Sequence, residues 1–388
     1  MTATAPLNLL YTDVEDDLRA AVRDALADRC PPAAVLGRVE GEEPYDPGLW
    51  RLLAAELGLA GLLIPEKLGG QGASAREAAV VLEELGRAVA PTPFLGSAVL
   101  ATSALLGCDL ADGSVGALLG RLAAGAATAT LAVPLSTAPG GPFPAGVRAD
   151  AEGRLTGAVT SVADARAADV LVVPAVGPEG PGLYEVAAAE VTVAGFTALD
   201  LTRPLADLRF DSAAGRKLPA ADPAAALESA LLTGAGLLAS EQLGVAQWCL
   251  DETVRYLGER RQFGRVVGSF QAVKHRLADL WLEVVNARAA ARSAADAVAS
   301  GALDTGVAVR VAQAYVSGVA VHAAEEAVQL HGGIGMTWEH PLHLYLKRAK
   351  ADAIALGTAG RHRAALGALV GLAPAQGLSI AEGPSSQG

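Results

Sequence analysis

The chain has 388 residues, which is enough for two or three packed units rather than one small domain. Apolar residues make up 52% of the sequence and charged residues only 19%, so a disordered, solvating chain is excluded. The net charge of −12 argues against a nucleic-acid-binding protein, which needs a basic face.

The first region, residues 1–125, has the pattern of a helical domain. Its first helix is predicted by apolar residues at helical spacing between acidic ones, at Val14, Leu18, Val22 and Leu26. A second helix is expected over 49–57, ending at Gly58. Ser74 followed by Glu77 has the spacing of a capping box, which predicts that a third helix starts after Ser74.

The second region, residues 126–222, changes to short β-prone runs. The runs TATLAVPL, GRLTGAVTSV, DVLVVPAV and LADLRFD are separated by turn clusters such as PGGPFPAG and GPEGPG. Short runs with this punctuation are typical of a small antiparallel β domain.

The third region, residues 223–372, returns to helical patterns. Four helices joined by short loops predict a four-helix bundle, over 226–262, 269–300, 304–331 and 343–356. Residues 373–388 are expected to form a flexible tail. The fold class is therefore α+β: an N-terminal helical domain, a middle antiparallel β domain and a C-terminal four-helix bundle.

The cysteines and the apolar runs bear on where the protein works. Cys30, Cys108 and Cys249 are far apart and odd in number, so we expect small buried side chains in a reducing compartment rather than disulfides. No basic stretch precedes an apolar one near the N-terminus, and no unbroken apolar run reaches the about 20 residues of a membrane span. We expect a soluble cytoplasmic protein that binds neither membranes nor nucleic acid.

The sharpest local feature is GERRQFGRVVGSFQAVKHR, a basic cluster in an otherwise acidic protein. Its cationic side chains are Arg260, Arg261, Arg265, Lys274, His275 and Arg276. The cluster lies where one long helix ends and, after a Gly-containing turn, another begins at Ser269. Arginines and free N–H groups at a helix start form a good seat for a phosphate or diphosphate. The alternative is a solvated helix end, and the residues alone leave both interpretations open.

A second feature is QLHGGIGMTWEHPLHLYLKRAK, in which Gly332 and Gly333 end a helix. Paired glycines let a flat ligand or another backbone approach, and Gln329 and His331 flank the turn. The alternative interpretation is an ordinary helix C-cap followed by a loop.

Other chemistry-bearing patterns are missing from the sequence. There is no G-x-S-x-G elbow, no P-loop and no G-x-G-x-x-G after a strand, so a Rossmann cofactor site is not expected. Glu339, His340 and His343 match no standard zinc motif, and no metal site is expected.

Together these segments resemble the acyl-CoA dehydrogenase family over nearly the whole chain. GLAGLLIPEKLGGQGASAREAAVVLEELGRAVAPTP is similar to the family's N-terminal helical segment, RRQFGRVVGSFQAVKHRLAD to its flavin-diphosphate motif, and QLHGGIGMTWEHPLHLYLKRAKA to its C-terminal signature. The resemblance implies FAD bound between subunits, an acyl-CoA substrate and an electron-transfer flavoprotein as electron acceptor. In the family a carboxylate takes the α-proton of the thioester while a hydride passes from the β-carbon to the flavin.

The resemblance also implies which residues touch the cofactor. The arginine and phenylalanine of the diphosphate motif would reach a flavin bound mainly by a neighbouring subunit, and the Gln-x-x-Gly-Gly turn would contact its adenosine side. The implied cofactor-binding residues are Arg260, Phe263, Gln271, Gln329, Gly332, Gly333 and Thr358.

The family's catalytic glutamate is missing at both of its usual positions. Counting without gaps, the position before the family's Gly-Thr pair is Leu356, and the alternative position on the first bundle helix falls at Gly234. Neither residue can accept a proton. The family's Trp-x-Thr element against the flavin ring is also missing, because Ser161 and Ala163 stand there.

This combination resembles the non-catalytic subunit of the heterotetrameric acyl-CoA dehydrogenases of steroid side-chain degradation. We therefore expect an acyl-CoA dehydrogenase subunit that completes the FAD site of a catalytic partner. Three alternatives stay open: a self-sufficient homotetramer with a displaced base such as Glu241, a flavin monooxygenase of the same fold, and a scaffold protein that has lost its flavin.

Overall fold

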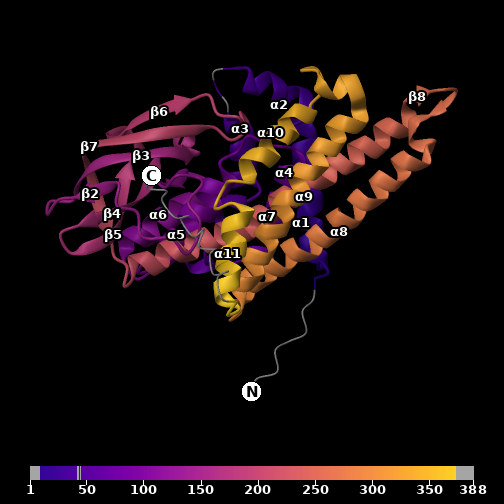
Figure 1. Cartoon of the computed structure of the whole chain (residues 1–388). Coiled ribbons are helices and arrows are strands. Elements are labelled where there is room, and N and C mark those ends of the chain that lie inside the picture. Colours follow the sequence, from indigo (N-terminus) through magenta and orange to yellow (C-terminus); the bar gives the residue numbers. More distant parts are fainter. Residues whose placement is uncertain (1–8, 42, 44, 373–388) are drawn as a thin grey trace, which may run out of the picture.

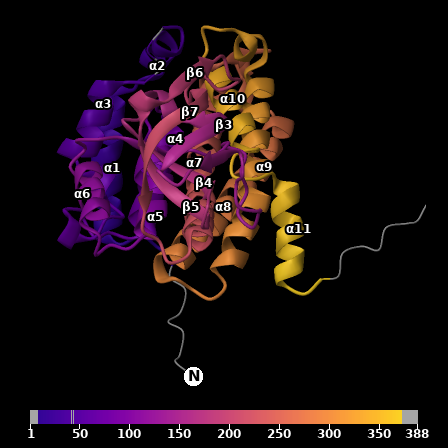
Figure 2. The same cartoon turned by 90° about the vertical axis from the view of Figure 1, so that its left-hand side faces the viewer.

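The computed structural model describes residues 9–41, 43 and 45–372. The tail predicted for 373–388 lies outside these residues. Helices at both ends of the chain flank a β domain, and the long C-terminal helices extend away from that domain (Figure 1). Figure 2 shows the strands in front of the helices, with the N-terminal helices on one side and the C-terminal ones on the other.

The N-terminal part contains six α-helices among the described residues. They are α1 (Asp13–Arg29), α2 (Pro32–Val39), α3 (Pro47–Arg51), α4 (Ala75–Arg87), α5 (Thr102–Leu106) and α6 (Gly113–Ala123). A π-helical turn, Leu52–Glu56, extends α3 toward Gly58, and another, Phe94–Ala101, leads into α5. The predicted capping box is confirmed, since the side chain of Ser74 accepts a backbone N–H of α4 and that of Glu77 accepts the N–H of Ser74.

The β domain is a closed ring of strands. Its strands are β1 (Ala129–Leu131), β2 (Val147–Ala149), β3 (Arg154–Ala163), β4 (Val170–Gly177), β5 (Gly180–Ala187), β6 (Thr192–Phe196) and β7 (Leu205–Leu218). The order β4-β2-β3-β7-β5 closes because β5 also pairs with β4, while β1 and β6 attach at β4 and β7. The pairings are antiparallel as predicted, except that β1 and β2 run parallel to β4.

The C-terminal part is built on three long helices, α7 (Pro223–Glu259), α8 (Gln271–Ser300) and α9 (Thr305–His331). The first ends three residues earlier than predicted, because Arg261–Gln262 (β8) and Arg265–Val266 (β9) form a small hairpin at the tip that α7 and α8 share (Figure 1). The contacts of α9 include both neighbouring long helices.

The last predicted helix is confirmed as α10 (Leu342–Asp352), which ends four residues earlier than predicted. A further helix that was not predicted, α11 (Ala359–Leu369), follows it, and both pack against α9. Leu356 and Gly357 separate them, with φ angles of 52° and 107° that no right-handed helix contains. The side chain of Thr358 then accepts the N–H of Arg361 and caps α11.

The interior is lined by small and medium aliphatic side chains. Cys30, Cys108 and Cys249 are free and buried, as predicted. By length and composition α7 and the segment Thr305–Met336 could each cross a membrane, but more than half of the apolar stretch in each is buried inside the fold. We therefore describe both as core helices of the bundle.

Candidate functional site

Four of the implied cofactor residues, Arg260, Gln329, Gly332 and Gly333, line one pocket of about 520 Å³. The pocket lies between the end of α7 and the end of α9, two segments that are 69 residues apart at Arg260 and Gln329. Arg260 is exposed, and its guanidinium has no ion-pair partner within the described residues. A β-carbon added to Gly332 or Gly333 would meet nothing within 4 Å, so the backbone there is open to a ligand.

Phe263 lies outside this pocket, at the tip of the β8–β9 hairpin. Phe263 and Gly264 have φ angles of 52° and 77°, the combination of a type I′ turn. The Phe263 ring is 90% exposed, and its contact with the Phe270 ring is an edge contact at 6.2 Å between centroids. An apolar ring held this far out by the chain's own backbone is positioned to touch another molecule.

The start of α8 lies beside the hairpin. No side chain caps this helix, and Gln271 is its first residue and is exposed. An uncapped helix N-terminus offers free N–H groups and a positive dipole end to an anion. Not every cation of the predicted basic cluster is free, since Arg276 binds Glu326 through two hydrogen bonds of 2.9 and 2.6 Å.

Leu356 and Gly234, the two positions where a glutamate was expected and is missing, meet inside the fold. A β-carbon on Gly234 would lie 3.2 Å from Cδ1 of Leu356 and would overlap Cδ2 of Leu100. Leu356 is fully buried and Leu100 is 4% exposed, so leucine side chains fill the space. Leu100, which lies on the π-helical turn before α5, had no signal in the sequence that linked it to this position.

The backbone of Leu135 connects Leu356 to Ser161, which stands where the resemblance places the family's Trp-x-Thr element. Its carbonyl accepts the N–H of Leu356 at 2.7 Å, and its N–H donates to the carbonyl of Ser161 at 2.9 Å. The N–H of Ser161 in turn donates to Asp207 at 2.9 Å. Both backbone groups of Ser161 are therefore bonded within the chain and are not directed at a ligand.

Glu241, the acid considered as a displaced base, is locked in a buried ionic network. Its carboxylate accepts hydrogen bonds from Arg203 and Arg348, which also bind Asp352 and Asp200 respectively. Burial acts to raise the pKa of Glu241, but the two arginines outweigh it and the pKa is lowered. An ionised carboxylate already shared by two guanidinium groups is a poor proton acceptor.

Glu228, the other acid near Gly234, lies toward the first turns of α7. Its carboxylate accepts the N–H of Gly140 at 2.6 Å and is 4.0 Å from Arg310. These contacts hold Glu228 against the loop that follows β1.

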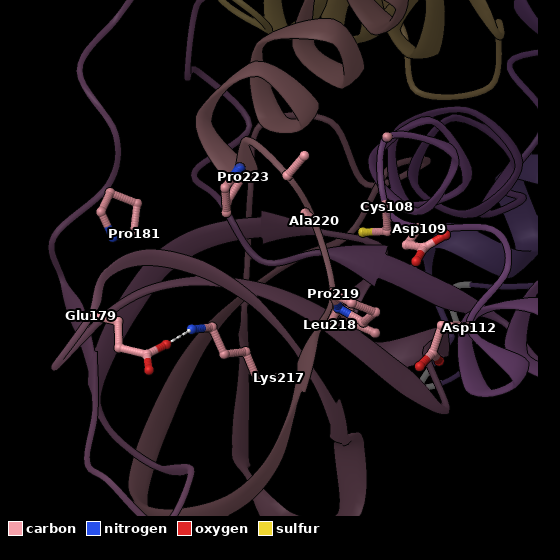
Figure 3. A pocket seen from close by; sticks show the side chains of 12 residues that line it. Cys108, Asp109, Asp112, Glu179, Pro181, Lys217, Leu218, Pro219, Ala220 and Pro223 are labelled. Carbon is pink, nitrogen blue, oxygen red and sulfur yellow. Dashed lines mark hydrogen bonds and ion pairs between the residues drawn. The ribbon is translucent and has the colours of Figure 1, made fainter.

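A separate cavity of about 940 Å³ lies at the junction of β7 and α7 (Figure 3). Cys108, Asp109 and Asp112 line one side of it. Across from them Lys217 and Glu179 point toward one another and form an ion pair of 2.6 Å. None of the implied cofactor residues lines this cavity, so it is not part of the candidate site.

Comparison with known proteins gives matches at both ends of the chain. The family model "Acyl-CoA dehydrogenase, N-terminal domain" matches residues 12–108, and "Acyl-CoA dehydrogenase, C-terminal domain" matches residues 224–370. Acyl-CoA dehydrogenase IpdE2 of Mycolicibacterium smegmatis is 38% identical over 341 residues, which cover 88% of this chain and 93% of that protein.

Two solved structures are similar over almost their whole length. The ChsE4-ChsE5 complex from Mycobacterium tuberculosis contains a chain that is 31% identical, with a TM-score of 0.82, covering 95% of this chain and 100% of that one. A variant of the Tcur3481-Tcur3483 steroid ACAD is 32% identical, with a TM-score of 0.80, covering 92% and 98%.

Proposed function

The chain belongs to the acyl-CoA dehydrogenase family, and we propose that it completes the FAD site of a catalytic partner subunit rather than acting as a whole enzyme. The family consists of FAD-dependent oxidoreductases that act on CH–CH groups. The bound FAD would supply the hydride acceptor. The observation that supports the proposal is the contact between Leu356, Gly234 and Leu100, because leucine side chains fill the place that the resemblance assigns to the family's base.

The residues fit one half of an FAD molecule. Arg260 is a cation without an ion-pair partner in the part of the chain that the structure describes, it lies beside the open turn at Gly332 and Gly333, and the uncapped start of α8 adds N–H donors nearby. A guanidinium and helix-end N–H groups together suit a doubly charged diphosphate. These features support the role of Arg260, Gln329 and the glycine turn in holding the diphosphate and adenosine of a flavin.

The residues do not fit the other half. Ser161 and Ala163 offer no aromatic ring, and the backbone groups of Ser161 are bonded to Asp207 and Leu135. The ring of the flavin and the base would therefore come from the partner, while Phe263, at the exposed hairpin tip, and Gln271 would reach toward that partner's cofactor. Thr358 caps α11 and would take part only through its position beside Leu356 and Gly357.

The relatives support the choice of partner and substrate. The ChsE4-ChsE5 structure is a complex of two named chains, and the Tcur3481-Tcur3483 protein is described as a steroid ACAD. We extend both features to this chain: a hetero-oligomer with a catalytic acyl-CoA dehydrogenase subunit, and an acyl-CoA of steroid type as substrate. The family resemblance adds an electron-transfer flavoprotein as electron acceptor. Its three free, buried cysteines fit the cytoplasm.

The test is to purify the chain alone and together with a co-expressed acyl-CoA dehydrogenase encoded beside it. Flavin absorbance and acyl-CoA oxidation with an artificial electron acceptor are then measured on both samples. We expect stable FAD and turnover only in the co-purified complex. Full FAD loading and turnover by the chain alone would reject the proposal.

A further inference from the structure

Three side chains that commonly bind metals meet at a place that the proposed function does not use. They come from three elements: Glu252 from α7, His331 from the end of α9, and His340 from the loop before α10. One ligand atom of each lies within 4.8 Å of the others. Nε2 of His340 is 3.8 Å from Oε1 of Glu252, and the two imidazole centroids are 4.8 Å apart.

His331 shows that the cluster has an unused ligand atom. Its side chain is buried, with 3% exposure, and its ring stacks on Tyr256 at 4.3 Å. Nδ1 is 2.7 Å from the carbonyl of Ala327, and since a carbonyl can only accept, Nδ1 carries the proton. Nε2 then holds a lone pair, yet it is buried without a hydrogen-bond partner among the described residues.

An unpaired buried nitrogen of this kind destabilises the fold unless something binds it. An Nδ1–H bonded to a backbone carbonyl is also the usual arrangement of a metal-binding histidine, because it fixes the tautomer and aims Nε2 at the ion. His331 therefore has the orientation and the free lone pair that a ligand needs.

The other two side chains also have ligand atoms available. Arg255 donates one hydrogen bond to each carboxylate oxygen of Glu252, which leaves further lone pairs on these oxygens free. The backbone N–H of Leu342 is 3.4 Å from Nδ1 of His340, too long to fix its tautomer.

We propose that His331, His340 and Glu252 bind a divalent transition-metal ion, Zn²⁺ being the ion that this ligand set fits best. Two imidazoles and one carboxylate with an open fourth position form a familiar zinc ligand set. Metal–ligand distances of about 2.0–2.2 Å require the three atoms to move closer together. Glu252 and His340 can make this movement, since their side chains are 17% and 13% exposed. His331 also lines the pocket of Arg260, so the ion would lie at its edge.

The site adjoins the pocket of Arg260, but none of its three ligands belongs to the implied FAD residues. The sequence could not reveal it. His340 was considered with Glu339 and His343, its neighbours in the chain, whereas the ligands that the fold brings to it are Glu252 and His331.

The experiment uses the full chain without a histidine tag, freed of metal by a chelator. Zn²⁺ is titrated by calorimetry, and Co²⁺ is titrated by its visible absorption bands. We expect one saturable site per chain, and we expect His340→Gln and Glu252→Gln each to weaken it at least about tenfold. His343→Gln and Glu325→Gln are the matched controls on neighbouring surfaces and should leave it unchanged.

Circular dichroism establishes that each variant is folded, and zinc X-ray absorption of the unmodified chain gives a reading that does not depend on any variant. Two imidazoles and one oxygen donor from the protein are expected around the ion. No saturable binding, equal binding in the His340 and Glu252 variants, or a coordination shell without two imidazoles would overturn the proposal. FAD loading with a partner is not part of this test, so each proposal can fail without the other.

Discussion

Cδ1 of Leu356 lies 3.2 Å from the point that a β-carbon on Gly234 would occupy. The two positions that the resemblance assigns to the family's glutamate are thus neighbours in space, although one is on α7 and the other on the loop before α11. Both sides of the contact are apolar, and Leu100 closes it. A carboxylate that is missing from one position is therefore not replaced from the other.

The first prediction concerns the backbone of Leu356, whose φ of 52° is in the left-handed region. Leu356→Ala should destabilise the protein by about 2–5 kcal/mol, because it leaves a cavity in a fully buried place. Leu356→Gly leaves a larger cavity but removes a left-handed strain of about 1–2 kcal/mol. We expect the glycine variant to melt above the alanine variant in a thermal scan. A higher melting temperature for the alanine variant would show that the left-handed backbone of Leu356 is not strained.

The second prediction concerns the fit of Gly234 against Leu100. Gly234→Ala gains about 1 kcal/mol of helix propensity, but its new methyl group would overlap Leu100 at a cost of about 1–3 kcal/mol. The substitution should lower the melting temperature of the natural protein and raise that of a Leu100→Ala variant. A double-mutant cycle of the four proteins measures the coupling, and additive effects would show that the two side chains do not compete.

The sequence predicted features that depend on neighbouring residues correctly. It predicted features that depend on the three-dimensional arrangement less well. Ser74 and Glu77 cap α4 as their spacing predicts, since a capping box needs only three residues of separation. The helix predicted over 343–356 is confirmed as α10, but its last four residues are not helical, and nothing in the sequence pattern shows that Leu356 has a positive φ.

Residues that are far apart in the sequence were harder still. Arg260 and Gln329 were linked only through the family resemblance, and the structure places both in one pocket. Leu100 and the arginines around Glu241 come from elements that are distant in the sequence. Without spatial information the sequence can show neither that Leu100 lies against Gly234 nor that the two arginines bind Glu241.

The third prediction concerns pH. Burial raises the pKa of Asp352 from 3.8 to about 8, and the attraction of Arg203 offsets this only in part. The folded protein thus keeps a proton that the unfolded chain releases above pH 3.8. The stability that the protonated Asp352 contributes is fully present below pH 3.8. It decreases as the pH rises and is lost above about pH 8.

Asp352→Asn mimics the protonated carboxyl and should not lose that contribution. We expect the melting temperature of the natural protein to fall relative to that of Asp352→Asn between pH 6 and pH 9. Asp251→Asn, which changes a carboxylate bound to Arg87 at the surface, is the control and should follow the natural protein. Parallel curves of melting temperature against pH for all three proteins would show that Asp352 is ionised in the folded protein.

The fourth prediction compares two adjacent arginines. Arg260 lines the pocket between α7 and α9, whereas Arg261 is also exposed, on β8, but does not line it. In the co-purified complex Arg260→Ala should weaken FAD retention at least tenfold by dialysis, since a charge-assisted contact to a diphosphate is lost. Arg261→Ala should retain FAD. Equal losses would mean that general positive charge, not the pocket, holds the cofactor.

The most direct measurement of the central claim is exchange of the α-hydrogen of an acyl-CoA with D₂O, followed by mass spectrometry. The chain is assayed alone with FAD and in complex with a partner whose own general base has been removed. With leucines at the reaction position, we predict no deuterium incorporation above the buffer blank in either sample. Incorporation that exceeds the blank would show that this chain supplies a base, and the proposed division of labour between two subunits would be wrong.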